Sequence, residues 1–115
     1  MTYEQELGNP MTTIHLIYIT TGDKEEARQI GKVLVESRLA ACVNIIDHMS
    51  SLYRWEGKIQ EDQEVILIAK TTEKNLPALK KKVKAMHSYD CPCMVCLPVT
   101  DGHEPFLAWI RGQVM

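Results

Sequence analysis

Two long β-type segments that meet at a short turn restrict the fold of this chain more than any other feature. Residues 41–55 are rich in β-branched, aromatic and other apolar side chains, and residues 58–70 end in the strongly apolar run 65–69. Glu56-Gly57 between the two segments suits a hairpin turn. Both arms exceed the usual strand length of about five or six residues. The interruption at 47–51 predicts a bend or bulge. The pattern therefore predicts a long antiparallel hairpin that projects beyond the core of a small domain.

A strand and a helix precede this hairpin. Residues 13–20 are rich in β-branched and aromatic side chains and predict a strand that is buried on both faces. The segment 23–37 begins with Asp23, a good N-cap residue, and Glu26 follows three positions later. Apolar residues then recur every three or four positions, as in a helix with one face in the core. The chain is therefore expected to start as a strand–helix unit.

A second helix, a fourth strand and a last helix follow the hairpin. Thr72 or Asn75 is predicted to cap the second helix, the strand spans 92–99, and Pro105 begins the last helix. The resulting β-α-β-β-α-β order with a terminal helix is the ferredoxin-like split βαβ arrangement, an α+β fold. It predicts an antiparallel sheet of four strands with two helices on one face.

The length and composition indicate one globular domain. The chain has 115 residues, of which 45% are hydrophobic and 24% are charged, and its net charge is −2. This balance argues against a disordered chain and gives no electrostatic basis for binding nucleic acid. We expect a flexible tail at 1–12 and a single domain at 13–115, with no membrane span and no secretion signal. The expected location is the cytoplasm, where the four cysteines would be reduced.

The apolar residues of the two long strands fall at both odd and even positions. Because alternate side chains of a strand point to opposite faces, the sheet face turned away from the helices is also expected to be apolar. A monomer would expose this patch to water, which soluble monomers avoid. The pattern predicts a homo-oligomer, and closed cyclic symmetry is the usual form.

Four sequence blocks resemble those of the CutA divalent-cation tolerance proteins, in the same order and with nearly no gaps over residues 13–113. The blocks are Leu39-Ala40-Ala41-Cys42-Val43-Asn44, Ser51-Leu52-Tyr53-Arg54-Trp55-Glu56-Gly57-Lys58, Lys70-Thr71-Thr72, and His87-Ser88-Tyr89 through Leu97-Pro98-Val99. The resemblance implies a ferredoxin-like fold and a tight homotrimer that is similar in architecture to the PII signalling proteins. It also implies a link to copper and other divalent metal ions, and it implies no enzymatic reaction.

The chain departs from the pattern of this family at three positions. Ser88 stands where the family usually has proline, and Cys93 stands where it usually has glutamate. Ile19 occupies a place where some bacterial members carry a cysteine late in the first strand. The missing carboxylate at position 93 brings into question any family role that depends on it.

The resemblance implies a metal role for Cys42, because family members hold a cysteine there. His87 follows the second helix, and a neutral imidazole is a good ligand for Cu or Zn. We therefore expect Cys42 and His87, with Cys93 as a third residue, to bind a divalent ion, copper above all. The alternative is structural. Cys42 would then be a small buried hydrophobe, and His87 would contact the last carbonyls of the helix.

The cysteines near the fourth strand have a spacing with two interpretations. Cys93 and Cys96 form a C-x-x-C motif, which chelates metal ions when it lies on a loop. On a strand, positions 93 and 96 point to opposite faces, and Cys91 and Cys93 share a face instead. Buried or edge cysteines without a metal role are therefore weighed against a soft-ion site at Cys91 and Cys93.

Four further residues are candidates for a cleft between subunits. Tyr53 and Trp55 lie two positions apart, hence on one strand face, where they suit intersubunit packing or a binding cleft. Lys70 ends a strand, and its amine would either meet an anion at the N-terminus of the next helix or extend into water. Tyr89 belongs to the block that resembles the family and is expected to line the same cleft.

Three functional classes compete. The leading hypothesis is a cytosolic homotrimer that binds divalent or soft metal ions and contributes to metal tolerance. The second is a PII-like regulatory module that binds a small anion or a partner protein between subunits, although the chain has no Gly-rich phosphate loop. An enzyme is not expected, because no set of nucleophile, base and acid is visible. The lysines at 80–84 are interpreted as a solvated helix face.

Overall fold

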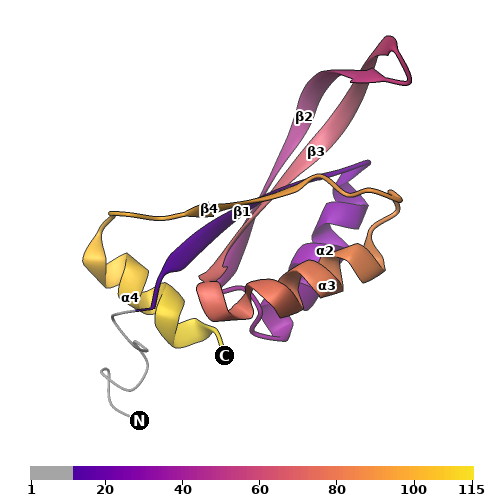
Figure 1. Ribbon diagram of the computed structural model, residues 1–115. Helices are drawn as coiled ribbons and strands as arrows, with labels where there is room; N and C mark the ends of the chain where they lie inside the picture. The colour runs from indigo at the N-terminus through magenta and orange to yellow at the C-terminus, as the bar shows by residue number, and fades with distance from the viewer. Residues whose placement is uncertain (1–11) are drawn as a thin grey trace.

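The computed structural model describes residues 12–115, so the predicted tail lies outside the described residues except for Thr12. The predicted order of strands and helices is confirmed (Figure 1). The elements are β1 (Ile14–Thr21), α2 (Lys24–Glu36), β2 (Cys42–Trp55), β3 (Lys58–Thr72), a 3₁₀ turn (Glu73–Asn75), α3 (Leu76–Met86), β4 (Met94–Pro98) and α4 (Glu104–Gln113).

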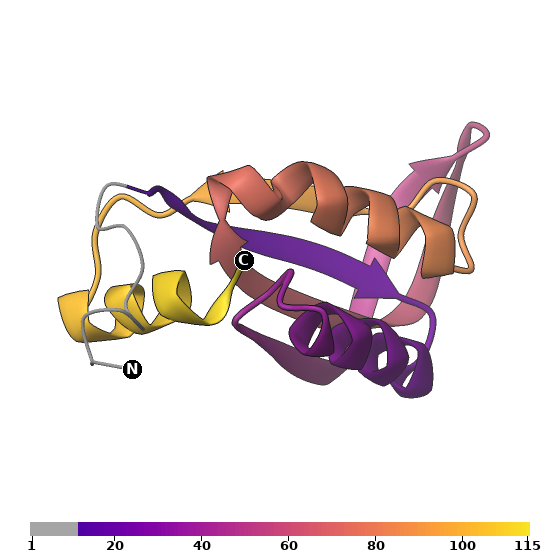
Figure 2. The ribbon, with the colours of Figure 1, turned by 90° about the horizontal axis from the view of Figure 1, so that it is seen from below.

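The four strands form one antiparallel sheet in the order β2-β3-β1-β4. Helices α2 and α3 lie side by side on one face of it, and α4 lies at the end of the sheet where β1 begins (Figures 1 and 2). This is the ferredoxin-like arrangement that the sequence predicts. The other face, which α2 and α3 leave uncovered, is called the open face below.

The main core fills the space between the sheet and the helix pair. Alternate residues of the two central strands point into it, and α2 and α3 contribute the apolar stripes that their periodicity predicts. The fully buried members include Ile17, Ile19, Leu67, Ala69, Ala27, Ile30, Leu34, Leu79 and Val83. Helix α2 lies close to the sheet at Gly31, where an added Cβ would lie 2.9 Å from Cγ2 of Val43.

The caps of the two long helices differ in how they form. Asp23 caps α2 as predicted, because its Oδ1 accepts a hydrogen bond of 2.8 Å from the backbone N–H of Glu26. At α3, Asn75 is the N-cap residue, one of the two predicted, but its side chain makes no capping hydrogen bond. The Asn75 amide donates instead to Thr72 Oγ1 and to the carbonyl of Met115, at 2.9 and 3.0 Å. The Asn75 side chain therefore binds the last residue of the chain and not the first turn of α3.

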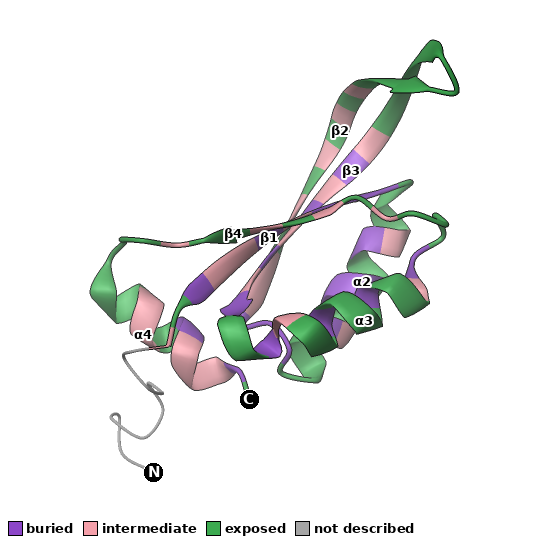
Figure 3. Cartoon of the chain, viewed as in Figure 1, coloured by how far each residue is buried: buried purple, intermediate pink, exposed green. Residues whose placement is uncertain are grey.

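The long hairpin is confirmed and gives the chain an extent of 54 Å, against 26 and 24 Å in the other directions. Its tip is exposed (Figure 3). The turn residues Glu56 and Gly57 both have positive φ, of 51° and 78°, as in the tight turns that suit hairpins. The predicted bulge lies between Ile46 and Met49, where the pairing with β3 shifts register and His48 adopts a φ of 63°.

Candidate functional site

His87 lies at the C-terminal end of α3 and is buried beneath the loop that leads to β4. Its side chain is fully shielded from water, and its Nε2 donates a hydrogen bond of 2.7 Å to the carbonyl of Thr20. Its Nδ1 accepts one of 3.0 Å from the backbone N–H of Tyr89. These two contacts require the neutral tautomer with its proton on Nε2. The imidazole thus joins the loop to the end of β1.

Glu26, in the first turn of α2, holds the same loop from the other side. Its two carboxylate oxygens accept backbone N–H bonds from Ser88 and Gly22, at 2.7 and 3.1 Å, and Oε2 lies 4.0 Å from Nδ1 of His87. Partial burial works to raise the pKa of Glu26. The hydrogen bonds from Ser88 and Gly22 outweigh that effect and lower the pKa. The carboxylate is therefore the favoured form.

Tyr89 extends this cluster to the hairpin. Its ring lies 4.7 Å from that of His87, at an interplanar angle of 55°, and its hydroxyl donates a hydrogen bond of 3.0 Å to Glu64 on β3. Partial burial and the Glu64 carboxylate raise the pKa of Tyr89. The phenol is therefore a stable hydrogen-bond donor. We call Glu26, Glu64, His87, Ser88 and Tyr89 the loop cluster.

Cys42 and Lys70 lie on the open face, away from the loop cluster. They are paired across β2 and β3, and the lysine amine donates a hydrogen bond to Oδ1 of Asn44. Because Leu67 and Ala69 point into the core beneath the helices, Lys70 points the other way. The amine is thus directed away from the N-terminus of α3, where an anion was predicted to meet it.

The β-bulge decides which face Tyr53 and Trp55 occupy. Before the bulge, even-numbered residues of β2 pair with even-numbered residues of β3. After it, odd-numbered residues do so, including Tyr53 with Gln60. The Tyr18 hydroxyl, on the open face, accordingly donates to Sδ of Met49 at 3.3 Å. Tyr53 and Trp55 therefore lie on the open-face side of the hairpin. The hydrogen bond that the Tyr53 hydroxyl donates to Asp62 raises the pKa of this phenol.

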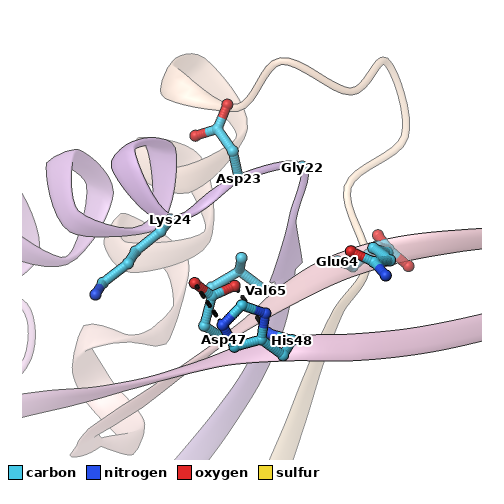
Figure 4. A pocket seen from close by; sticks show the side chains of 8 residues that line it. Gly22, Asp23, Lys24, Asp47, His48, Glu64 and Val65 are labelled. Atoms are coloured by element: carbon cyan, nitrogen blue, oxygen red, sulfur yellow. Dashed lines mark hydrogen bonds and ion pairs between the residues drawn. The ribbon is translucent and has the colours of Figure 1, made fainter.

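An open pocket of about 260 Å³ lies between the start of α2 and the bulge. Figure 4 shows Asp47 and His48 close together, while the side chains of Asp23 and Glu64 lie apart from them. Oδ1 of Asp47 accepts the backbone N–H of His48 at 2.8 Å, and Oδ2 lies 3.8 Å from its Nε2. Within residues 12–115 no three His, Cys, Asp or Glu side chains come close enough to hold a metal ion.

The three predicted metal ligands do not come together in one chain. Cys42 is half-buried on the open face, His87 has both ring nitrogens engaged by backbone groups, and Cys93 is exposed before β4. The two cysteines of the C-x-x-C motif also lie in different surroundings. Cys96 packs against the core on the helix side, as expected for positions 93 and 96 of a strand, and Cys93 does not. The ligand assignments stay predictions.

The two carboxylates that organise the loop cluster, those of Glu26 and Glu64, were not predicted as site residues. Glu26 is recognised in the sequence only as part of a helix N-terminus, and Glu64 is not singled out. The capping pattern after Asp23 does signal a carboxylate that reaches back to the turn, which Glu26 does at Gly22. No local pattern indicates that it also binds Ser88, which lies 62 positions away along the chain.

Comparison with known proteins bears directly on this geometry. A family model described as the CutA1 divalent ion tolerance protein matches residues 15–113, from the first strand to the last helix. The chain belongs to the CutA1 family. Both the loop cluster and the open face lie inside the matched region, so the CutA1 resemblance is confirmed over residues 15–113.

CutA1 relatives from distant organisms are similar over most of this chain. A divalent-cation tolerance protein CutA from Thermus thermophilus is 49% identical over 84% of this chain and 93% of its own length. The human protein CutA is 39% identical over 86% of this chain, which spans 55% of the human sequence. The name of the Thermus thermophilus protein refers to divalent cations, not to copper, and to tolerance rather than to a reaction.

Solved CutA1 structures share the fold. The divalent cation tolerance protein from Thermus thermophilus superimposes with a TM-score of 0.87 at 46% identity, covering 89% of this chain and 99% of that one. CutA1 from Oryza sativa gives 0.89 at 37% identity, covering 93% and 98%. At this similarity the CutA1 structures support both the strand order and the long hairpin. In the described part of this chain, no helix has the length and apolar character of a membrane span.

Proposed function

We propose that this protein is a homotrimer that binds divalent metal ions, copper first among them, and contributes to the response of the cell to those ions. Membership of the CutA1 family supports the link to divalent-cation tolerance. The observation that carries the proposal is the open face, which is apolar and uncovered in the single chain. Both the trimer and the metal sites follow from how this face is closed.

Exposed apolar side chains on the open face support the assembly. Ile46, Val95 and Leu97 are each about half exposed, at 49%, 49% and 50%. They alternate with core residues along their strands. Val95 and Leu97 pair with Tyr18 and Leu16, and Ile46 pairs with Ile66. Burial of apolar surface stabilises an assembly by about 25 cal/mol for each Å² removed from water. Association through this face, with the hairpins packed against neighbouring subunits, removes the patch from water.

The scattered ligands support metal sites that need more than one subunit. Cys42 lies at the edge of the open face, so closing that face brings copies of this thiol toward other chains. We assign His87 and Cys93 as further ligands at the loop. To bind an ion through Nδ1, His87 must release the N–H of Tyr89, and the Glu26 carboxylate at 4.0 Å then lies within reach as an added donor.

Native mass spectrometry of the metal-free protein, titrated with Cu²⁺ without reducing agent, tests this proposal. We expect a trimer that takes up the same number of ions per subunit, with uptake lost in the double variant Cys42→Ala/His87→Ala. The matched control is His103→Ala, which changes an exposed histidine. Equal uptake by the wild type and the double variant would reject these ligands, and a monomeric mass would reject the trimer.

A PII-like module is the second candidate, favoured by one specific observation. Lys70, Tyr53 and Trp55 share the open-face side of the sheet and hairpin, where subunits would meet. Lys70 lies at the base of the hairpin and the two rings lie near its tip, so a cleft that holds a small anion or a partner protein between this amine and aromatic rings would need more than one subunit. Tyr89 would border that cleft only through Glu64. Thermal stabilisation by small anions that is lost in Lys70→Ala supports this module, and its absence for every anion tested counts against it.

We further propose a cytoplasmic location. All four cysteines are free, and a reducing compartment keeps them so. A CutA structure from Archaeoglobus fulgidus is described as periplasmic, so the location has to be tested on this protein itself. Cell fractionation with antibody detection is expected to find it with cytoplasmic markers, and recovery in the periplasmic fraction would contradict the proposal.

A further inference from the structure

Cys91 and Cys93 form a pair of exposed thiols on the loop before β4. Both are free, and a single residue, Pro92, separates them. Two Cα atoms at this spacing lie no more than about 7 Å apart, even on fully extended backbone. Both sulfur atoms are therefore able to reach one small ion. The assignment of Cys93 alone to a site with Cys42 and His87 leaves this pairing unused.

The loop that carries the pair is held at both ends. At its start, the backbone N–H groups of Ser88 and Tyr89 are bound by Glu26 and His87. At its end, the carbonyl of Cys93 accepts a hydrogen bond of 3.3 Å from the N–H of Thr20. Proline between the thiols fixes one backbone angle. The pair is thus partly organised before any ion arrives, which reduces the entropy lost on binding.

The donors around the pair restrict which ion it would take. Cys96 is turned into the core, and no cluster of three His, Cys, Asp or Glu donors occurs in the described part of the chain. Structural zinc sites need four ligands in a tetrahedron, and magnesium or calcium needs several oxygens. Thiolate ligands, in contrast, select soft ions such as Cu(I), for which two sulfur ligands suffice.

We propose that Cys91 and Cys93 together bind one Cu(I) ion through two thiolates. The inference rests on the proposed metal-binding function and specifies, for one site, the oxidation state and the ligands. On binding, two S–Cu bonds form and the two thiols release their protons. No electron is transferred, because the ion arrives already reduced. Each chain carries a complete pair, so this site does not depend on the trimer.

Competition against a chromophoric Cu(I) chelator, under anaerobic conditions with ascorbate, tests the pair. We expect the intact protein to withdraw one Cu(I) per subunit from the chelator, and Cys91→Ser/Cys93→Ser to withdraw none. The control Cys96→Ala removes a thiol that packs against the core, keeps the pair and is expected to match the wild type. Each single variant is expected to lose the ion as well, because one thiolate cannot replace two. Circular dichroism verifies that all variants are folded.

Two results would overturn the proposal. One is a double variant that competes for Cu(I) as well as the wild type does. The other is a wild-type protein that leaves all the ion with the chelator. Failure here is separable from failure of the proposed function. Cu²⁺ uptake that depends on Cys42 and His87, with no Cu(I) held by the pair, rejects only this inference. Cu(I) held without Cu²⁺ uptake rejects only the earlier ligand assignment.

Discussion

At the scale of single residues, Glu26 connects parts of the chain that lie far apart in sequence. It belongs to the first turn of α2, yet its carboxylate binds the N–H of Ser88 after α3 and approaches the ring of His87. Only 15% of its side chain is exposed, so water screens these contacts weakly. Hydrogen bonds to a charged acceptor are stronger than those to a neutral one. The negative charge therefore contributes to holding the loop.

Replacing Glu26 by Gln is expected to lower the free energy of unfolding by about 1–3 kcal/mol at neutral pH. The pKa of Glu26 is lower in the folded protein than in the unfolded chain, so its contribution is full above the ordinary glutamate pKa. It is lost as pH falls through the folded pKa. The difference between wild type and variant should therefore shrink in acid. Urea unfolding over a pH series, at fixed subunit concentration, measures it.

Glu25→Gln is the matched control for this experiment. Glu25 is exposed in the same turn of α2, and its carboxylate only accepts a long bond of 3.4 Å from Gln29. It should change stability little, by about 0.5 kcal/mol or less. A loss in Glu26→Gln that is the same at every pH would show that shape, and not charge, matters at this position.

At the scale of elements, the contact of α2 with the sheet depends on the absence of a side chain at Gly31. An added Cβ would meet Cγ2 of Val43 at 2.9 Å and Cδ1 of Leu67 at 3.3 Å. Valine is β-branched and has little rotational freedom with which to give way. The helix and the sheet must therefore separate slightly if any side chain is added there.

Gly31→Ala is expected to destabilise the protein by about 1 kcal/mol. Overpacking costs about 1–3 kcal/mol, and the better helix propensity of alanine offsets about 1 kcal/mol of it. Thermal unfolding compared with the exposed control Arg28→Ala measures the difference. An unchanged or raised midpoint of thermal unfolding for Gly31→Ala would mean that the sheet shifts to make room for the methyl group without loss of stability.

The hairpin turn gives a second prediction at this scale, with a different cause. Gly57 has a φ of 78° and open space around it, so an added Cβ there meets no atom within 4 Å. Gly57→Ala should still cost about 1 kcal/mol, because left-handed backbone is unfavourable for alanine. Amide hydrogen exchange is expected to accelerate in the hairpin and not in the helices. Equal exchange at the tip in both proteins would contradict this explanation.

At the scale of the whole molecule, the open face is expected to determine whether the protein is a monomer or an oligomer. Val95 lies on the edge strand β4, opposite Tyr18, and about half of it is exposed. A carboxylate at this position would be solvated in a monomer. Between apolar surfaces it would lose that hydration without a partner. The two states of the molecule therefore respond differently to one substitution.

Val95→Glu is expected to leave the helices folded and to dissociate the oligomer. Light scattering after size exclusion measures the mass, and circular dichroism measures the fold. Lys81→Glu, on the exposed face of α3, is the control and should keep the mass of the wild type. An unchanged mass for Val95→Glu would show that subunits do not meet at this part of the open face.

Much of the fold was predictable because its signals are local. Asp23 before α2, Glu56-Gly57 at the turn, and apolar periods of two or about 3.6 each reflect the backbone geometry of a few neighbouring residues. Asn75 is the N-cap residue of α3, as predicted among two candidates, but its side chain makes no capping hydrogen bond, for the opposite reason. Asn75 is drawn to the carbonyl of Met115, a partner 40 positions away that no local pattern specifies.

The candidate site was predictable only in part. His87 and Tyr89 were singled out from the sequence as candidate site residues, but the carboxylates of Glu26 and Glu64 that bind around them were not. The single extra residue of the bulge also reversed the face of Tyr53 relative to the strand before it. Pairing register is a property of two strands together, so it cannot be predicted from the sequence of one strand.

The sequence by itself determined the order of the elements, the long hairpin, the apolar open face and the family. Each of these depends on alternation, helical period or turn chemistry, which short stretches of chain contain completely. Only the tertiary structure decided that both nitrogens of His87 are engaged, that Cys42 lies apart from it, and that Cys96 is turned away from Cys93. These facts depend on which side chains approach one another across the fold. Residues that meet there lie far apart in the sequence, and no local pattern marks them as neighbours.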